Sequence, residues 1–283
     1  MGEDIIASDK MVLDELEHLM GIRIPRVNRV FSFIHHENEE EEHVKETLFG
    51  HVIENGRITE LGLYTHINNY AVTNPISGYR MRVSKHSVGK LPDSIGNLEK
   101  LKVLYMTHNR VEKLPESFAN LQNLKDLDIA NNFLVEFPEP IIKLHDLQQL
   151  SLNKNSITTI PRTINRLQNL KSLFLAGNLI KTLTSEIGDL KNLEDLWLND
   201  NPLESIPESV YELEKLKELE LSDTKLTQIS PKIGEMKSLE YIALAGTEID
   251  FEDEDLYELL SEMYSLGVEM DCGIADEFQK PEP

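Results

Sequence analysis

The sequence is short of the residues that mark secreted, metal-binding and membrane proteins. It has a single cysteine, Cys272, among 283 residues, which excludes an internal disulfide and a multi-cysteine metal site. It has no run of roughly 18 apolar residues, and its N-terminus is acidic where a signal peptide would be basic. These absences predict a cytoplasmic protein without a membrane span or a membrane partner.

Basic residues are also scarce. The chain has 28 lysines and arginines against 50 aspartates and glutamates, a formal net charge of −22. Such a chain is repelled by phosphate backbones, so we expect no nucleic-acid partner. The acidic residues concentrate in residues 193–283, which hold 25 of them and 6 basic residues. This negative field can keep the chain soluble or steer a basic partner toward it, and the composition leaves both interpretations open.

The motifs of enzymes are missing as well. There is no glycine-rich phosphate loop, no HExxH pair and no nucleophile elbow. His35, His36 and His43 flank an acidic run and could chelate a divalent metal, but we interpret this segment as a flexible acidic loop. We therefore expect a protein that is not an enzyme and that needs no metal or cofactor.

What the chain does have is an internal repeat of 23 residues. Each unit opens with leucine at position 1 and has further apolar residues at positions 4, 6, 11, 14, 18 and 21. The leucines at position 1 are Leu101, Leu124, Leu147, Leu170, Leu193, Leu216 and Leu239. The asparagines at position 9 are Asn109, Asn132, Asn155, Asn178 and Asn201, and the prolines at position 15 are Pro92, Pro115, Pro138, Pro161 and Pro207.

The spacing predicts the structure of each repeat. Apolar residues at positions 4 and 6 have the period of a strand with one buried face. Asparagine at position 9 suits the turn that ends the strand, and proline at position 15 favours an extended return leg with at most a short helical turn. No repeat can bury its own apolar residues. The repeats must therefore stack into a right-handed α/β solenoid with a concave parallel β-sheet, capped at both ends.

This pattern resembles the leucine-rich repeat family, in its 23-residue intracellular, Ras-suppressor-like type, over residues 58–250. The chain departs from it at Thr224 and Thr247, where threonine replaces the asparagine. The resemblance implies a signalling protein that binds another protein, with a small GTPase or a phosphatase as the implied kind of partner.

Elements outside the repeats are predicted to cap them. Residues 1–57 combine a helical pattern with two alternating segments around Asn55 and Gly56, the signal of a type I′ hairpin. At the other end, residues 251–274 predict a capping helix followed by a strand, and residues 275–283 a flexible tail. The repeats occupy residues 58–250 between them.

One repeat is longer than the others. Leu101 follows Ile58 by 43 residues instead of 23, which places an insertion at about residues 67–86. We predict that the insertion forms a hairpin, and it can be either a tolerated loop excursion or a basic, aromatic contact element. Its candidate contact residues are Tyr70, Tyr79, Arg80, Arg82 and Lys85.

The candidate binding surface is the concave face of the sheet, where positions 3 and 5 of each repeat point away from the core. Parallel strands lie about 4.8 Å apart, so Phe174 and Trp197 are predicted to lie side by side in water among acidic residues. An aromatic pair rimmed by charge is typical of an interaction hot spot for a basic and apolar partner. The candidate residues are Tyr105, Asp126, Asp128, Phe174, Asp195, Trp197, Asp200, Glu218, Glu220, Asp223 and Tyr241.

The sequence therefore predicts a non-enzymatic scaffold that binds another protein on its concave face. The alternative is a regulatory adaptor that contacts its partner through the basic insertion at residues 67–86.

Overall fold

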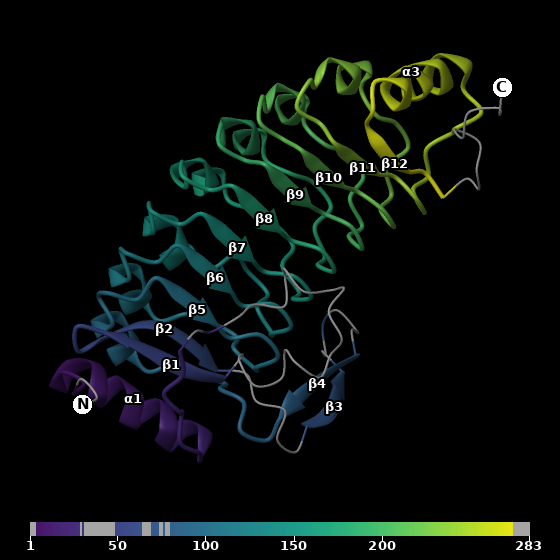
Figure 1. The fold of residues 1–283 in the computed structure, drawn as a ribbon. Coiled ribbons are helices and arrows are strands. Elements are labelled where there is room, and N and C mark those ends of the chain that lie inside the picture. Colours follow the sequence, from purple (N-terminus) through teal and green to yellow (C-terminus); the bar gives the residue numbers. More distant parts are fainter. Residues whose placement is uncertain are drawn as a thin grey trace. The chain divides into compact units, whose positions relative to one another are not determined.

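The structure is a computed structural model, and it divides the chain into two compact units, residues 1–156 and 157–283. The residues that it describes are 4–28, 30, 49–63, 69–73, 76 and 80–273. The three histidines of the acidic segment and the predicted tail at residues 275–283 lie outside the described residues. In each unit, short parallel strands form one layer and short helical turns form the other (Figure 1).

The first unit begins with the predicted helix, α1 (Ala7–Met20). Val12, Leu13, Leu16 and Met20 are buried on one face of α1, whereas Leu19, which the helical pattern places on the same face, is 51% exposed. The helix ends at Gly21, whose φ of 67° lies in the left-handed region that glycine adopts at low cost. An amphipathic helix with a glycine stop thus covers the beginning of the repeats.

The predicted hairpin follows as β1 (Phe49–Glu54) and β2 (Arg57–Leu63), which pair antiparallel. Asn55 and Gly56 between them have φ angles of 51° and 75°, and two positive values identify the predicted type I′ turn. The second arm enters the repeat register, because β2 pairs in parallel with the first strand of the regular repeats.

The insertion contains a second antiparallel hairpin, β3 (Asn69–Thr73) and β4 (Arg80–Ser84). These two strands form a separate two-stranded sheet. The pairing of these two described strands confirms the predicted hairpin.

The regular repeats contribute one three-residue strand each, at positions 3 to 5. The strands of the first unit are β5 (Val103–Tyr105), β6 (Asp126–Asp128) and β7 (Gln149–Ser151). The second unit has β8 (Ser172–Phe174), β9 (Asp195–Trp197), β10 (Glu218–Glu220) and β11 (Tyr241–Ala243). Consecutive strands within each unit pair in parallel, so the 23-residue period places equal repeat positions side by side.

The return legs end in five-residue 3-10 helices, which confirms the prediction of a short helical turn. They are η2 (Asp93–Asn97), η3 (Glu116–Asn120), η4 (Glu139–Lys143), η5 (Arg162–Arg166), η6 (Ser185–Asp189), η7 (Glu208–Glu212) and η8 (Pro231–Glu235). In five of them the residue before the helix is the position-15 proline in extended conformation. Proline has no N–H and a fixed φ, so it suits the residue that precedes a helix start.

The asparagines of position 9 hold the turns together. Asn132 is fully buried, its amide nitrogen donates to the carbonyls of Met106 and Ile129, and its oxygen accepts from the Val111 N–H at 2.9 Å. Where threonine replaces asparagine, at Thr224, the hydroxyl keeps one bond of this kind, to the Leu221 carbonyl at 2.8 Å. The repeat therefore tolerates the departure with fewer bonds between neighbouring turns.

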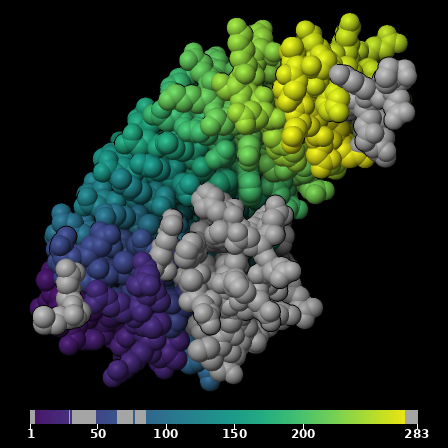
Figure 2. All heavy atoms as spheres, in the orientation of Figure 1, coloured from purple at the N-terminus to yellow at the C-terminus, as the bar shows by residue number. Residues whose placement is uncertain are grey.

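The second unit closes with α3 (Glu254–Ser265) and β12 (Glu269–Asp271). The Asp253 side chain caps the helix by accepting the Leu256 N–H at 2.9 Å. The strand pairs in parallel with β11 and extends the sheet. Figure 1 shows α3, in yellow, beside the last strands, and Figure 2 shows the same yellow end of the chain with all its atoms.

Candidate functional site

The face of the strands that carries positions 3 and 5 is the candidate surface, and we call it the sheet face. In the second unit, strand pairing arranges its side chains in two rows. The position-3 row is Ser172, Asp195, Glu218, Tyr241 and Glu269. The position-5 row is Phe174, Trp197, Glu220, Ala243 and Asp271. From β9 to β12 the rows combine two aromatic side chains with five carboxylates.

The predicted aromatic pair forms, but one of its rings is buried. The ring centroids of Phe174 and Trp197 lie 4.6 Å apart with an interplanar angle of 66°, an edge-to-face arrangement. Trp197 is half-buried, whereas Phe174 is only 3% exposed. The prediction that both rings lie in water is therefore wrong for Phe174, because the larger indole beside it removes its ring from solvent.

Two further predicted contact residues, both in the first unit, are also buried. Tyr105 is 7% exposed and Asp128 is 1% exposed, while Asp126 on the same strand as Asp128 is half-buried. The Asp128 carboxylate accepts the N–H of Ala130 at 2.9 Å, so it satisfies the backbone where strand β6 ends. The side chains at these positions therefore point away from the core but are not exposed to solvent.

The same bond recurs in the second unit with less burial. Glu220 accepts the Ser222 N–H at 3.0 Å, and Asp271 accepts the Gly273 N–H at 3.0 Å. Each carboxylate keeps a second oxygen that can accept from a partner, since a carboxylate can accept several hydrogen bonds. Glu220 is half-buried and Asp271 is exposed, so both are accessible.

Trp197 is oriented by the acidic row beside it. Its indole N–H donates to the Glu218 carboxylate at 3.4 Å, across from β9 to β10. On the other side, Asp195 accepts the Ser172 hydroxyl at 2.5 Å. Both acids are half-buried on β9 and β10, so the indole lies in a negatively charged setting.

Tyr241 lies among carboxylates on both sides. Burial raises the pKa of its phenol, and the negative charges of Glu220, Asp271, Glu218 and Glu269 raise it further. Each of these four carboxylates would repel a phenolate. The same charges attract a cation placed over the ring.

The predicted acids Asp200 and Asp223 lie in the turns after β9 and β10. Both are exposed and both have φ of 54°, in the left-handed region. The equivalent residue of the next repeat, Gly246, has φ of 70°, and a Cβ there would lie 2.4 Å from an Asp223 oxygen. Glycine adopts this φ at low cost, and its lack of a side chain leaves room for the Asp223 carboxylate.

Glu269 and Asp271 also lie on the sheet face, although neither is among the residues predicted from the sequence. They follow Tyr241 and Ala243 by 28 residues rather than 23, because α3 replaces the short helical turn of a regular repeat. Extrapolation of the 23-residue period therefore misses them. Their signal is the alternation in the run Glu269-Met270-Asp271 after the helix stop at Gly267.

The remaining candidate residues belong to the insertion. Tyr79 lies outside the described residues, and Tyr70, Arg80 and Arg82 are placed on β3 and β4 by their backbone alone. Lys85, just after β4, is exposed. Their predicted role as contact residues stays a prediction.

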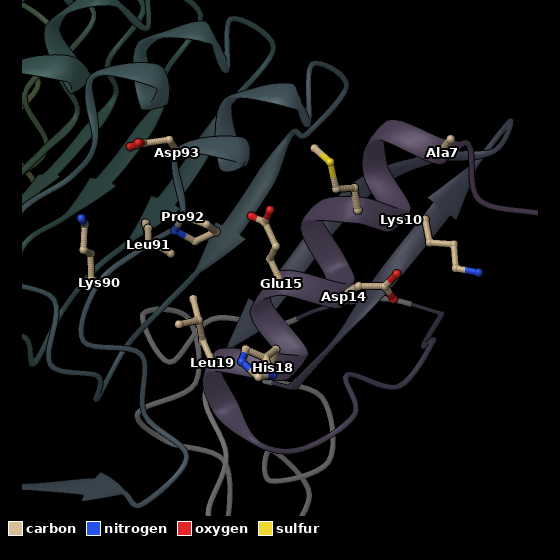
Figure 3. Close-up of a pocket in the computed structure, with 11 residues that line it drawn as sticks. Ala7, Lys10, Asp14, Glu15, His18, Leu19, Lys90, Leu91, Pro92 and Asp93 are labelled. Carbon is tan, nitrogen blue, oxygen red and sulfur yellow. The ribbon is translucent and has the colours of Figure 1, made fainter.

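A separate groove of about 690 Å³ runs along α1 in the first unit (Figure 3). Leu19 and the unlabelled Met11 of α1 are 51% and 46% exposed, and Leu91 and Pro92 lie opposite the helix. Its described charged lining residues are of both signs: Lys10, Asp14, Glu15, Lys90 and Asp93. Because the charges nearly balance, they favour no one kind of ligand.

The thiol of Cys272 and any metal-binding groups bear on the reactivity of the described part of the chain. Burial raises the pKa of the Cys272 thiol to about 11, so the thiolate is a minor species at neutral pH. Among the described residues, no three His, Cys, Asp or Glu side chains converge as metal ligands. None of the described helices has the length and apolar character needed to cross a bilayer.

Parallel strands every 23 residues, joined through asparagine turns and 3-10 helices, define a solenoid protein of leucine-rich repeats. Residues 79–173 and 162–273 match the family described as a leucine-rich repeat region. The chain therefore belongs to the leucine-rich repeat family. No curated protein sequence matches it.

Solved structures with the same fold come from several organisms. The leucine-rich repeat protein LIC12759 of Leptospira interrogans is 33% identical, over 65% of this chain and 52% of that one, with a TM-score of 0.54. The internalin InlF of Listeria monocytogenes is 22% identical over 75% of this chain and 56% of that one, with a TM-score of 0.59. The crystal structure of PEPR1–AtPEP1 is 26% identical over 56% of this chain and 23% of that one, with a TM-score of 0.53. The chain thus spans about half the length of the first two proteins.

Proposed function

We propose that this chain is a non-enzymatic scaffold whose sheet face, in the second unit, binds a basic segment of another protein. The family supports the general class, since leucine-rich repeat solenoids use the extended faces of their stacked repeats for binding. The two aromatic side chains and five carboxylates on the sheet face of β9 to β12 support the choice of this surface. We also propose a cytoplasmic location and a role in signalling, which rest on the sequence and on its resemblance.

One observation carries the proposal: a half-exposed tryptophan lies within a field of carboxylates. Trp197 has Glu218 in hydrogen-bonding contact and Glu220 opposite it on β10. Tryptophan is the aromatic side chain that attracts cations most strongly, and nearby carboxylates add charge-assisted hydrogen bonds. A lysine or arginine of the partner would contact the indole face and pair with these acids.

The geometry also defines what Phe174 contributes. With 3% exposure it offers a partner almost no surface, but it packs edge to face against the indole. We assign it the role of supporting Trp197 in its orientation. The partner-binding residues that we propose in the second unit are Asp195, Trp197, Asp200, Glu218, Glu220, Asp223, Tyr241, Glu269 and Asp271.

Affinity capture from the native cell tests this proposal with a matched pair of aromatic variants. Trp197→Ala removes the half-buried indole of the sheet face, and Tyr257→Ala removes a ring that is 42% exposed on α3 of the same unit. We expect a partner that wild type and Tyr257→Ala retain and that Trp197→Ala loses. Equal retention by all three proteins would refute the role of the sheet face.

A further inference from the structure

A second groove, of about 490 Å³, lies in the first unit and has a different composition from the groove along α1. It lies between the return legs of the repeats that begin at Leu101 and Leu124. Its described lining residues are Ile76, Glu112, Lys113, Leu114, Glu116 and residues 133–140. We call it the return-leg groove.

The apolar part of the groove comes from one unusual repeat. Position 12 is Val135 in this repeat, but a charged residue or threonine in the five other repeats between residues 101 and 238. Position 17 is Pro140 here and a polar or charged residue in the same five repeats. Phe133 in the same leg is half-buried and Val135 is 37% exposed, whereas Phe137 and Pro140 are buried. At position 12 an exposed apolar side chain thus replaces the charged residue or threonine of the other repeats.

The charged rim of the groove is strongly one-sided. Four exposed glutamates line it, Glu112, Glu116, Glu136 and Glu139, against the single lysine Lys113 among the described lining residues. Glu116 faces Lys143 at 4.0 Å, but both side chains are largely exposed, and such pairs contribute little. Within the described part of the chain, the other three glutamates form no ion pair.

We propose that the return-leg groove docks a second segment of a partner protein, one with apolar side chains flanked by lysine or arginine. Val135 and the half-buried Phe133 provide the apolar centre that protein interfaces concentrate, and the glutamates provide a polar rim of one sign. A basic segment pairs with that rim, whereas an acidic segment is repelled by it. This surface is independent of the sheet face proposed above.

A peptide selection on the full chain tests the groove. A random-peptide phage library is first depleted on Val135→Glu and then selected on the wild-type protein, so that only groove-dependent peptides remain. We expect the enriched peptides to combine lysine or arginine with leucine, isoleucine or phenylalanine. A synthetic copy of one such peptide should bind Val135→Glu about tenfold more weakly than wild type, and Glu136→Lys also more weakly than wild type.

Two control variants test whether the loss of peptide binding is specific to the return-leg groove. Thr158→Glu places the same charge at the same position of the next repeat, on an exposed side chain, and should change affinity less than about twofold. Trp197→Ala should bind the peptide as wild type does. The proposal is overturned if no peptide is enriched, if the enriched peptides are acidic, if Thr158→Glu weakens binding as much as Val135→Glu, or if binding is lost in Trp197→Ala.

Discussion

The indole of Trp197 and the ring of Phe174 meet edge to face, with their centroids 4.6 Å apart on neighbouring strands. The sequence predicted that both rings contact a partner, but the structure gives the two rings different roles. The buried phenylalanine belongs to the packed part of the repeat, and the half-exposed tryptophan is the side chain that a partner can reach.

The first prediction separates these roles by stability. Phe174→Ala should lower the free energy of unfolding by about 3–5 kcal/mol, the usual cost of emptying a buried aromatic site. Trp197→Ala should cost less, because part of its ring is already in water. Urea denaturation of the two variants measures the difference. A larger loss for Trp197→Ala than for Phe174→Ala would contradict the assignment.

The second prediction concerns charge on the sheet face. Glu218→Gln should keep the shape of the side chain but weaken capture of a basic partner, and capture should become less sensitive to salt because a screened attraction has been removed. The measurement is the amount of partner retained at increasing salt concentration. Glu258→Gln removes an exposed carboxylate from α3 and should leave capture unchanged.

The third prediction concerns the attachment of α1 to the repeats. The Asp9 carboxylate is fully buried, accepts the Ile58 N–H at 2.8 Å and pairs with the Arg57 guanidinium at 3.1 Å. Asp9→Ala leaves both donors without this acceptor and should cost about 3 kcal/mol of stability. Asp14→Ala, on an exposed position of the same helix, should change stability by less than about 0.5 kcal/mol. Faster amide exchange in β2 of Asp9→Ala alone would support the contact, and equal effects of the two variants would refute it.

The fourth prediction is a loss of stability in mild acid. Burial lowers the pKa of His51 from its ordinary value of 6.5, and the Arg26 charge lowers it further. Below pH 6.5 the unfolded chain therefore binds a proton at this site that the folded chain does not, so stability falls as the pH falls toward the folded pKa. Thermal unfolding between pH 7.5 and 5 measures the effect. A His51→Gln variant should show a smaller fall over that range, and an unchanged fall would assign it to other groups.

The fifth prediction distinguishes the scaffold from the adaptor that works through the insertion. Deletion of residues 67–86 also removes Ile76 from the lining of the return-leg groove, but it should leave capture through the sheet face intact if that face is the main binding surface. On the adaptor hypothesis the same deletion abolishes capture. The charge-reversed variant Arg80→Glu with Arg82→Glu keeps the length of the hairpin and gives an independent comparison for the same capture assay.

Most of the fold was predictable because it depends on local patterns. The type I′ turn at Asn55 and Gly56 and the helix ending at Gly21 depend on a few neighbouring residues. So does the strand of each repeat, which was predicted around positions 4 to 6 and lies at positions 3 to 5. Each pattern leaves its signal in the order of the residues. The period of 23 residues then determines which strand positions become neighbours.

The candidate surface was less predictable, since exposure depends on the sizes of neighbouring side chains. Tyr105, Asp128 and Phe174 point away from the core on their strands and are nevertheless buried. Glu269 joins the surface because α3 changes the interval between the last two strands.

By itself, the order of the amino acids determined a stacked repeat and the register of its strands, because burial of regularly spaced leucines allows one solution. The tertiary structure decided which ring stays in contact with water and where a run of apolar side chains opens into a groove. Those properties arise from residues that are distant in the chain and adjacent only after the repeats have packed.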